Sequence, residues 1–444
     1  MASTQTKNDV AWGKLFEKYN IEKEIEEKGF FIITSTQINE FREARLMTKF
    51  DNQKTLPELF KKNKLSILPI SGNSYILANF RLYENIPEIT TPTEFKDFPP
   101  YIESIDYNKI NSEAIALNCA YISEIIQDFL EEDEENGKIL PTVDGKMSSG
   151  KFDFIVDNKI KDSTYSISVD RSGIEIDAGY ESPNSLVLIE AKNVVADDFL
   201  VRQLYYPFRL WREKVNKKVR TIFMQYLNGV FSLYEYEFKD PNNYNSLELV
   251  KSKKYSIVSQ EEMEITLDDI LNILDNVKLL EEPDVTFPQA DSFERVISLL
   301  EMLNTDIVKT KEEITEEFKF DPRQTDYYFN AGKYLGFLVE EKVTVEEDGK
   351  SIEKPAIKLS SRGENIFKIS YKKRQLEYVK SILEHQVFNQ VLKDCIKAYG
   401  EMPCKAQIVI YMKEYLSREY SEETYKRRAS TISGWLNWIL GLYE

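Results

Sequence analysis

The sequence predicts a mixed α+β protein of the α/β class, built from several domains. In the central part of the chain, apolar residues follow a helical period, then a strand-like alternation, then a helical period again. The C-terminal third is rich in helical patterns. With 444 residues, 42% of them hydrophobic, the chain is too long for one ordinary core.

Residues 106–255 form the most informative block. A helix is predicted over 111–132, where apolar side chains recur at helical spacing. A second helix is predicted over 197–214, with a kink at Pro207. Two apolar runs on either side of Asn228-Gly229 then predict a tight hairpin. Between the two helices lie four strand-like runs, at 152–158, 165–170, 173–180 and 185–192.

The regions on either side of this block are predicted to be separate. Residues 1–105 mix helix and strand patterns and are expected to form an N-terminal α+β domain. A hairpin is expected around Ser71-Gly72-Asn73, and the prolines from Pro87 to Pro100 indicate a linker. Residues 256–290 are predicted to form an acidic connector helix.

The C-terminal part is predicted to hold two helix-rich domains. Residues 291–370 show three helical patterns and a charged hairpin with Asp348-Gly349 at its tip, an order typical of a winged helix. Residues 371–444 are expected to form a second winged-helix or helix-turn-helix-like domain. The aromatic residues Tyr327, Tyr328 and Phe329 are expected in the core rather than in a stacking surface.

Cysteine and histidine offer little chemistry. Cys119, Cys395 and Cys404 are widely separated and show no CxxC spacing, so no zinc site is expected. The single histidine, His385, is expected on a helix near a C-terminal core. If the protein is an enzyme, carboxylates, lysines and a metal ion must therefore do the work.

Charge and hydropathy restrict the function further. The net charge of −17 argues against a general nucleic-acid coat protein, because nonspecific DNA binding depends on Lys and Arg. From residue 371 to the end, however, twelve Lys and Arg stand against nine Asp and Glu, so a local basic face is expected. No apolar run approaches the roughly 20 residues that span a bilayer, and no secretion signal is visible. A soluble, cytoplasmic protein is expected.

One segment carries candidate catalytic residues. Asp177 ends one alternating run, and Glu190 and Lys192 end the next. Because side chains of a strand alternate between faces, Glu190 and Lys192 are expected on one face. A turn at Ser182-Pro183-Asn184 would bring Asp177 beside them. Two carboxylates and an ammonium suit Mg²⁺-dependent hydrolysis of a phosphodiester bond, which needs no histidine.

The segment resembles the PD-(D/E)XK nuclease superfamily, with the motif standing as Ile176-Asp177 and Glu190-Ala191-Lys192. The helix–strands–helix–strand order matches that superfamily's core, so residues 106–255 are expected to be the nuclease core. The chain as a whole looks like a type II restriction endonuclease with a winged-helix tail. Isoleucine stands where the motif's name has proline, a position that varies in the superfamily.

The resemblance implies a set of roles and partners. Asp177, Glu190 and the Ala191 carbonyl would hold Mg²⁺, and Gln203 would support Lys192 unless it is a plain polar helix residue. The substrate would be double-stranded DNA cut at a short specific sequence. One site per chain implies a homodimer, and a cognate DNA methyltransferase would act in the same system. Glu113, Glu124 or Glu175 could add a carboxylate, and the sequence does not choose among them.

Several basic and small residues are candidates for DNA contact, and the N-terminal domain is a candidate for recognition. The basic residues Lys426, Arg427 and Arg428 begin an amphipathic helix, which is either a DNA-contacting face or a solvated one. The other candidates are Arg42, Arg45, Lys49, Lys146, Ser148, Ser149 and Lys151. Two alternative functions stay open: a winged-helix DNA-binding regulator with an inactive nuclease-like core, and a repair or junction nuclease.

Overall fold

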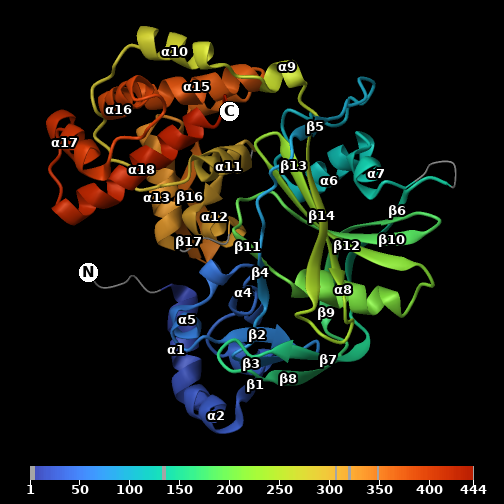
Figure 1. Ribbon diagram of the computed structural model, residues 1–444. Helices are drawn as coiled ribbons and strands as arrows, with labels where there is room; N and C mark the ends of the chain where they lie inside the picture. Colours follow the sequence, from blue (N-terminus) through green and yellow to red (C-terminus); the bar gives the residue numbers. More distant parts are fainter. Residues whose placement is uncertain (1–5, 133–136, 306–307, 319–321, 348–349, 444) are drawn as a thin grey trace.

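The computed structural model describes residues 6–132, 137–305, 308–318, 322–347 and 350–443. It has three parts, all visible in Figure 1: an N-terminal unit (residues 6–78), a central unit (79–256) and a C-terminal unit (257–443). Helices and strands are mixed, as the sequence predicts. Within the described ranges, no helix combines the length and apolar character needed to cross a bilayer.

The N-terminal unit packs helices against a three-stranded sheet of order β1-β3-β2. Trp12 lies at the centre of its core and donates its indole N–H to the Met47 carbonyl oxygen at 3.0 Å. The predicted hairpin around residues 71–73 is confirmed, because β2 and β3 pair antiparallel. Its elements are α1 (Lys7–Tyr19), α2 (Ile21–Lys28), β1 (Phe30–Thr34), α3 (Ser35–Asn39), α4 (Ala44–Met47), a 3₁₀ turn (Gln53–Thr55), α5 (Glu58–Lys62), β2 (Ser66–Pro69) and β3 (Ser74–Ala78).

The central unit is built on a seven-stranded sheet of order β5-β14-β13-β12-β10-β9-β6. Its chain runs through β4 (Tyr83–Asn85), β5 (Thr93–Phe95), α6 (Glu113–Ile122), α7 (Ile125–Leu130), β6 (Leu140–Ser148), β7 (Lys151–Asp157), β8 (Thr164–Asp170), β9 (Gly173–Glu181), β10 (Ser185–Lys192), β11 (Asp198–Leu200), α8 (Arg202–Arg212), β12 (Lys218–Leu227), β13 (Val230–Phe238) and β14 (Leu247–Ser256). Of the four predicted strands, β9 and β10 enter this sheet, whereas β7 and β8 pair separately.

Helices cover both faces of this sheet. On one face α6 and α7 pack against Val187, Ile189 and Ala191 of β10. On the other face α8 contacts β9, β10 and β12, and Figure 1 shows it crossing the sheet. β10 and β12 run parallel, with β11 and α8 forming the connection between them. The N-terminal ends of α6 and α8 therefore lie on opposite faces of the sheet, near the C-terminal end of β10.

Three local features differ from the prediction. The helix expected over 197–214 begins only at Arg202, because Asp198–Leu200 form β11, which pairs with β4. The single helix expected over 111–132 breaks into α6 and α7, because Glu124 takes a left-handed conformation with φ of 61°. The segment predicted as a linker, Pro87–Pro100, carries β5, which adds to the edge of the sheet beside β14. The hairpin at Asn228-Gly229 is confirmed, and both residues have positive φ. A side chain at Gly229 would also come within 2.9 Å of Tyr371.

The C-terminal unit joins helices to a small three-stranded sheet of order β15-β17-β16. Its elements are α9 (Gln260–Met263), α10 (Leu267–Asn276), α11 (Phe293–Leu303), β15 (Lys309–Thr310), α12 (Lys311–Phe318), α13 (Pro322–Tyr334), β16 (Leu338–Glu347), β17 (Lys350–Leu359), α14 (Ser361–Ile366), α15 (Tyr371–Leu383), α16 (Gln386–Lys397), α17 (Lys405–Tyr415) and α18 (Glu422–Leu440). The predicted hairpin tip, Asp348-Gly349, lies outside the described residues.

The two predicted C-terminal domains share one hydrophobic core, which runs from Ile265 to Leu440. Tyr328 and Phe329 lie in it, as expected, whereas Tyr327 is only half-buried and does not belong to this core. His385 is buried, as expected, but it lies just before α16 and not on a helix. Residues 371–443 contain helices and, as far as the structure describes them, no strand, so a second wing is not formed there. The acidic connector holds α10 as its main helix.

We expect the stability of this fold to depend on the ionisation of Glu301, on α11. Burial raises the pKa of Glu301 to about 7, and the nearby Arg374 and the Asn228 N–H only partly offset this effect. A raised carboxyl pKa means that the folded state loses stability as pH rises from about 4.5 to about 7. Glu301→Gln removes that loss.

The unfolding free energy of Glu301→Gln, measured relative to that of wild type, should therefore be about 2 kcal/mol higher at pH 8 than at pH 5. The half-buried side chain keeps some access to solvent, which limits the size of the effect. Urea unfolding at both pH values measures the difference. Glu261→Gln, at an exposed position of α9, is the control and should show no such gain. A Glu301→Gln effect that is the same at both pH values would contradict this account.

Candidate functional site

The strand register brings Asp177 next to Glu190. β9 and β10 pair antiparallel up to Ile189 opposite Ala178, so Glu190 and Asp177 follow directly as the next opposed positions. The strands are joined at Ser182, whose hydroxyl accepts hydrogen bonds from the backbone N–H groups of Asn184 and Ser185. Beyond the last paired residues of the two strands, the Asp177 carboxylate accepts a hydrogen bond from the Ala191 backbone N–H at 2.8 Å. The predicted turn and convergence are both present.

Lys192 lies among oxygen atoms at the end of β10. Its Nζ contacts Glu190 Oε1 and donates to the Ala191 carbonyl oxygen at 2.8 Å. Glu113 Oε1 lies 3.7 Å from the same Nζ. Glu190 and Lys192 share a strand face, as expected from alternation, and both side chains are nearly buried.

Helices on the two sides of the sheet complete the cluster. Glu113 is the first residue of α6, and Ser112 caps that helix by accepting the Ile115 N–H. Gln203 lies in the first turn of α8 and donates its amide N–H to Glu190 Oε1. Gln203 Oε1 is buried and has no hydrogen-bond partner among the described residues. In this structure Gln203 thus contacts the glutamate rather than the lysine.

Burial dominates the electrostatics of the cluster. It raises the pKa of Glu190 to about 7; Lys192 opposes this shift, and Asp177 adds to it. Burial also raises the pKa of Glu113. For Lys192, burial lowers the pKa, but Glu190, Glu113 and Asp177 together raise it above its usual value. The site therefore favours extra positive charge and holds the Lys192 ammonium in its protonated form.

This cluster lies in a large cleft of about 1190 Å³. All three units line it: the N-terminal unit with α1, α4 and α5, the central unit with α6, β9, β10 and α8, and the C-terminal unit with α12 and α13. Ten Lys and Arg and ten Asp and Glu occur among its lining residues, whereas the whole chain has 58 and 75. The cleft is thus less acidic than the rest of the protein.

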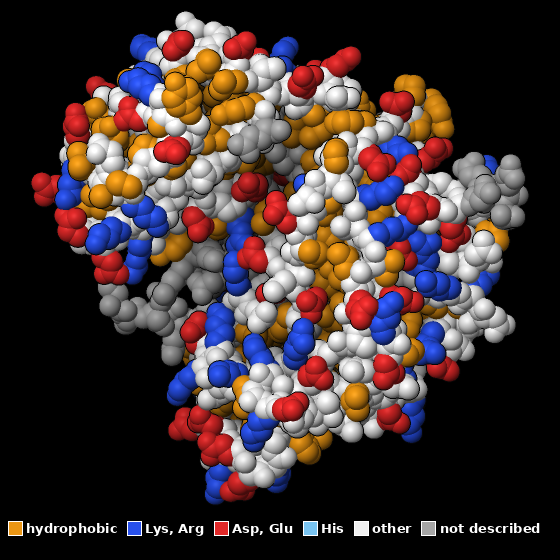
Figure 2. All heavy atoms as spheres, in the orientation of Figure 1, with side chains coloured by type: hydrophobic (Ala, Val, Ile, Leu, Met, Phe, Trp, Pro, Cys, Tyr) orange, Lys and Arg blue, Asp and Glu red, His pale blue; other side chains and the backbone are white. Residues whose placement is uncertain are grey.

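Most basic residues of the cleft belong to the N-terminal unit. Arg42, Arg45 and Lys49 line it, as does Lys146 from the central unit, so the structure brings these four predicted residues to the site. Lys49 lies near enough to Glu113 to lower that carboxyl's pKa. Figure 2 shows Lys and Arg side chains on the part of the N-terminal unit that faces the other units. Five further basic residues of the cleft were not predicted: Lys7, Lys54, Lys61, Arg202 and Lys311.

The alternatives for an accessory acid are now distinguishable by position. Glu113 contacts Lys192 directly. Glu175 also lines the cleft, but it is exposed and faces Lys146 at 4.0 Å. Glu124 is exposed at the break between α6 and α7 and does not line the cleft.

The remaining predicted DNA contacts lie elsewhere. Ser148 and Lys151 are exposed but do not line the cleft, and neither do Lys426 and Arg427 on α18. The prediction is wrong for Ser149 and Arg428, because both side chains are buried. The Ser149 hydroxyl donates to the Gly150 carbonyl oxygen and accepts the Ser172 N–H. The Arg428 guanidinium lies over the Tyr420 ring, with 3.7 Å between Cζ and the ring centre.

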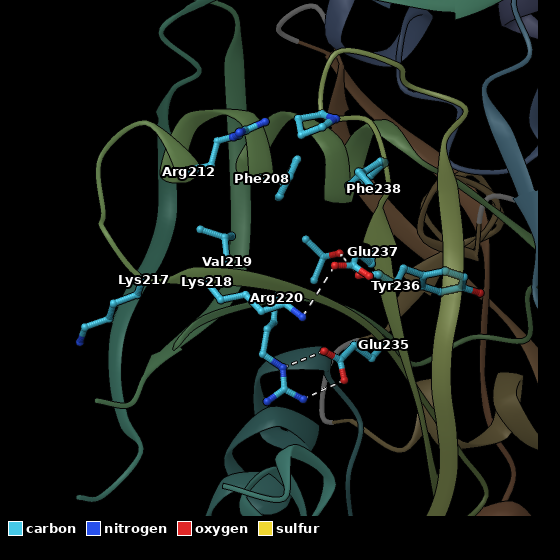
Figure 3. A pocket seen from close by; sticks show the side chains of 12 residues that line it. Phe208, Arg212, Lys217, Lys218, Val219, Arg220, Glu235, Tyr236, Glu237 and Phe238 are labelled. Atoms are coloured by element: carbon cyan, nitrogen blue, oxygen red, sulfur yellow. Dashed lines mark hydrogen bonds and ion pairs between the residues drawn. The ribbon is translucent and has the colours of Figure 1, made fainter. Parts of the chain in front are cut away.

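A smaller pocket of about 310 Å³ lies between α8, β12 and β13 and is shown in Figure 3. Its cations are largely held by carboxylates. Arg220 makes two hydrogen bonds to Glu235, at 2.7 and 2.8 Å, and Lys218 lies 3.7 Å from Glu237. This pairing is typical of a structural charge network rather than of a catalytic site.

The chemistry of the main cluster fits a hard divalent cation. Asp177, Glu190 and the Ala191 carbonyl supply oxygen donors, the type that Mg²⁺ prefers. A cation, the Lys192 ammonium, already lies against Glu190 and the Ala191 carbonyl, and Gln203 Oε1 is a further buried oxygen without a partner in the described chain. Among the described residues, no three Asp, Glu, His or Cys side chains are already gathered as a complete ligand set.

Three family models match the chain, and each is described as a domain of unknown function. DUF6996 matches residues 9–77, DUF6997 matches residues 78–256 and DUF7226 matches residues 295–444. The first two spans coincide with the N-terminal and central units, and the third covers the C-terminal unit without α9 and α10. The second span contains the cluster around Glu190, whereas the basic cleft residues of the N-terminal unit (Arg42, Arg45 and Lys49) and the α12–α13 edge lie outside it. No curated protein and no solved structure matches the chain.

Proposed function

We propose that the protein is a Mg²⁺-dependent endonuclease that hydrolyses phosphodiester bonds in double-stranded DNA at a short specific sequence. The observation that carries the proposal is the convergence of Asp177, Glu190 and Lys192 at the C-terminal end of β10, inside a cleft with a basic wall. The motif's resemblance to the PD-(D/E)XK superfamily, and to type II restriction endonucleases in particular, adds to that support. The α11–α13 helices with the β15–β17 sheet have the element order of a winged helix, which suits a DNA-binding tail.

The residues divide into distinct roles. Asp177, Glu190 and the Ala191 carbonyl would hold Mg²⁺, which supplies Lewis-acid chemistry by lowering the pKa of water and offsetting phosphate charge. The Lys192 ammonium contacts Glu190 and lies 3.7 Å from Glu113, and it would stabilise the phosphorane-like transition state as a positive charge. Gln203 orients Glu190 through its hydrogen bond.

Glu113 is the best candidate for the general base. Its pKa is raised by burial, which moves it toward the working pH, and it lies 3.7 Å from Lys192 at the open side of the cluster. It can therefore accept a proton from the attacking water while Lys192 faces the phosphate. The basic wall of Arg42, Arg45 and Lys49 would hold the DNA backbone. One site per chain implies that two protomers pair to cut both strands.

Incubation of the purified chain with plasmid DNA and Mg²⁺ should give discrete fragments. Glu190→Ala and Lys192→Ala should each lower the single-turnover cleavage rate by about 100-fold or more, with DNA binding retained. Glu175→Gln, on the same cleft wall but outside the cluster, should cut nearly as well as wild type.

Three outcomes would contradict this function. Cleavage by Glu190→Ala would remove the site assignment. A folded wild-type protein that binds DNA without cutting it would favour a winged-helix regulator with an inactive core. Nicking that depends on DNA structure instead of sequence would favour a repair or junction nuclease.

Mg²⁺ should stabilise the folded protein through this site. At ten times its dissociation constant, the ion is expected to add about 1.4 kcal/mol to the unfolding free energy. Thermal unfolding with and without Mg²⁺ measures this. Asp177→Asn should lose most of the gain while folding normally, because its amide oxygen can still accept the Ala191 N–H. Equal stabilisation of wild type and Asp177→Asn would place the ion elsewhere.

Removal of the basic wall should weaken DNA binding in a salt-dependent way. A plot of log affinity against log salt concentration has a negative slope. In the triple variant Arg42→Ala, Arg45→Ala, Lys49→Ala, this slope should become shallower by about 0.9 for each phosphate that the protein no longer neutralises. Fluorescence anisotropy over a salt series measures this slope. The pair Lys426→Ala and Arg427→Ala, outside the cleft, is the control. A larger effect of the control pair would move the DNA-binding face to α18.

A further inference from the structure

A short segment joins the two halves of the candidate site. Lys192 ends β10, residues 193–197 follow without regular structure, and β11 leads directly into α8, which carries Gln203. Both Lys192 and Gln203 contact Glu190 Oε1. Any shift of this joining segment (residues 193–197) therefore moves one or both groups that hold Glu190.

The C-terminal unit attaches to the joining segment from one side. Ser298 Oγ on α11 donates to the Asn193 carbonyl oxygen at 3.5 Å. Val194 packs against the hydrophobic core of the C-terminal unit. Arg295, also on α11, donates to Asp197 Oδ2 at 3.1 Å. The first, second and fifth residues after Lys192 are thus all in contact with that unit.

The N-terminal unit attaches from the other side, at the end of the same segment. Lys54 forms an ion pair with Asp197 Oδ2, the atom that Arg295 also contacts. The next residue, Asp198, accepts the Gln53 N–H at 2.9 Å and the Gln53 side-chain amide at 3.3 Å. Lys54 itself lines the cleft near the proposed DNA-binding wall. Asp197 is therefore a point where all three units meet.

The Asp197 carboxylate is ionised in this setting. Burial raises its pKa, but Lys54 and Arg295 more than offset that effect, so the pKa lies below its usual value. The carboxylate is about half exposed, whereas the Arg295 side chain is nearly buried. Asp197 can thus hold both cations without being fixed inside a core itself.

We propose that Asp197 is a positioning residue that ties the N-terminal and C-terminal units to the segment between Lys192 and Gln203, so that DNA held by either unit sets the geometry around Glu190. The inference rests on the proposed nuclease function and adds a way in which DNA engagement is transmitted to the site. The two cations reach one oxygen atom from opposite units, so movement of either unit pulls on the same residue.

Attachment of the C-terminal unit does not depend on Asp197 alone. Asn228 exchanges two hydrogen bonds with Gln375, at 3.1 and 2.8 Å, and its N–H faces Glu301. Asn111 donates to the Asn304 carbonyl oxygen at 3.2 Å. Removal of the Asp197 carboxylate should therefore leave the units folded and docked, and change mainly the position of the joining segment.

The test compares Asp197→Ala, Asp197→Glu and a control in the full chain. At saturating DNA and Mg²⁺, Asp197→Ala should lower the single-turnover rate constant at least tenfold, while the dissociation constant for DNA changes less than threefold. Asp197→Glu should restore most of the rate. Glu237→Ala is the matched control, because Glu237 is also a half-exposed carboxylate held by two lysines, Lys218 and Lys239, but outside the cleft.

A second readout does not need cleavage. Hydrogen exchange of the Ala191 amide, which Asp177 accepts, should become at least tenfold faster in DNA-free Asp197→Ala and stay unchanged in Glu237→Ala. If wild type cuts no DNA but this exchange responds, the nuclease proposal fails and the positioning role stands. The positioning role would be overturned if the Ala191 exchange rate is unchanged in Asp197→Ala and this variant cleaves DNA as fast as wild type. It would also be overturned if the exchange rate is unchanged and the variant loses cleavage rate and DNA affinity to the same extent.

Discussion

The candidate site depends on one backbone interaction, the hydrogen bond from the Ala191 N–H to the Asp177 carboxylate. Up to Ile189, β10 pairs with the backbone of β9, and after it the side chain of Asp177 takes over as the partner. Because this side-chain hydrogen bond replaces a backbone one, Asp177 stays beside Glu190 although the backbone pairing of β9 and β10 has ended. The space that opens there is occupied by the carboxylates, the Lys192 ammonium and the ends of α6 and α8.

Much of this arrangement could be predicted from local sequence, because it depends on alternation and turn chemistry. Two residues at spacing two on a buried strand must share a face, and Ser182-Pro183-Asn184 is a clear turn signal. The position of Glu113 could only be predicted as one of three alternatives. It depends on where the N-terminus of α6 meets the sheet, which is a matter of tertiary packing and not of spacing along the chain.

Burial was the main property that the sequence could not supply. Arg428 stands in a basic run with Lys426 and Arg427, but on a helix successive residues point in different directions, and only Arg428 turns toward Tyr420. Ser149 likewise has the sequence context of a flexible loop residue and is enclosed by its own hairpin. Lys54, Lys61 and Arg202 carried no motif, because their common feature is the cleft that three distant segments form together. Basic positions shared among related N-terminal units would be the signal to seek.

The single core that runs from Ile265 to Leu440 has a consequence for how the chain can be divided. Helix α11 packs both on α13, within the first predicted C-terminal domain, and on α18, at the far end of the second. A fragment that stops near residue 370 would leave this helix with a bare apolar side in water. The tail is therefore expected to evolve, fold and be trimmed as one piece, and a shortened gene would have to end before Ile265, where this core begins, to encode a product that does not aggregate.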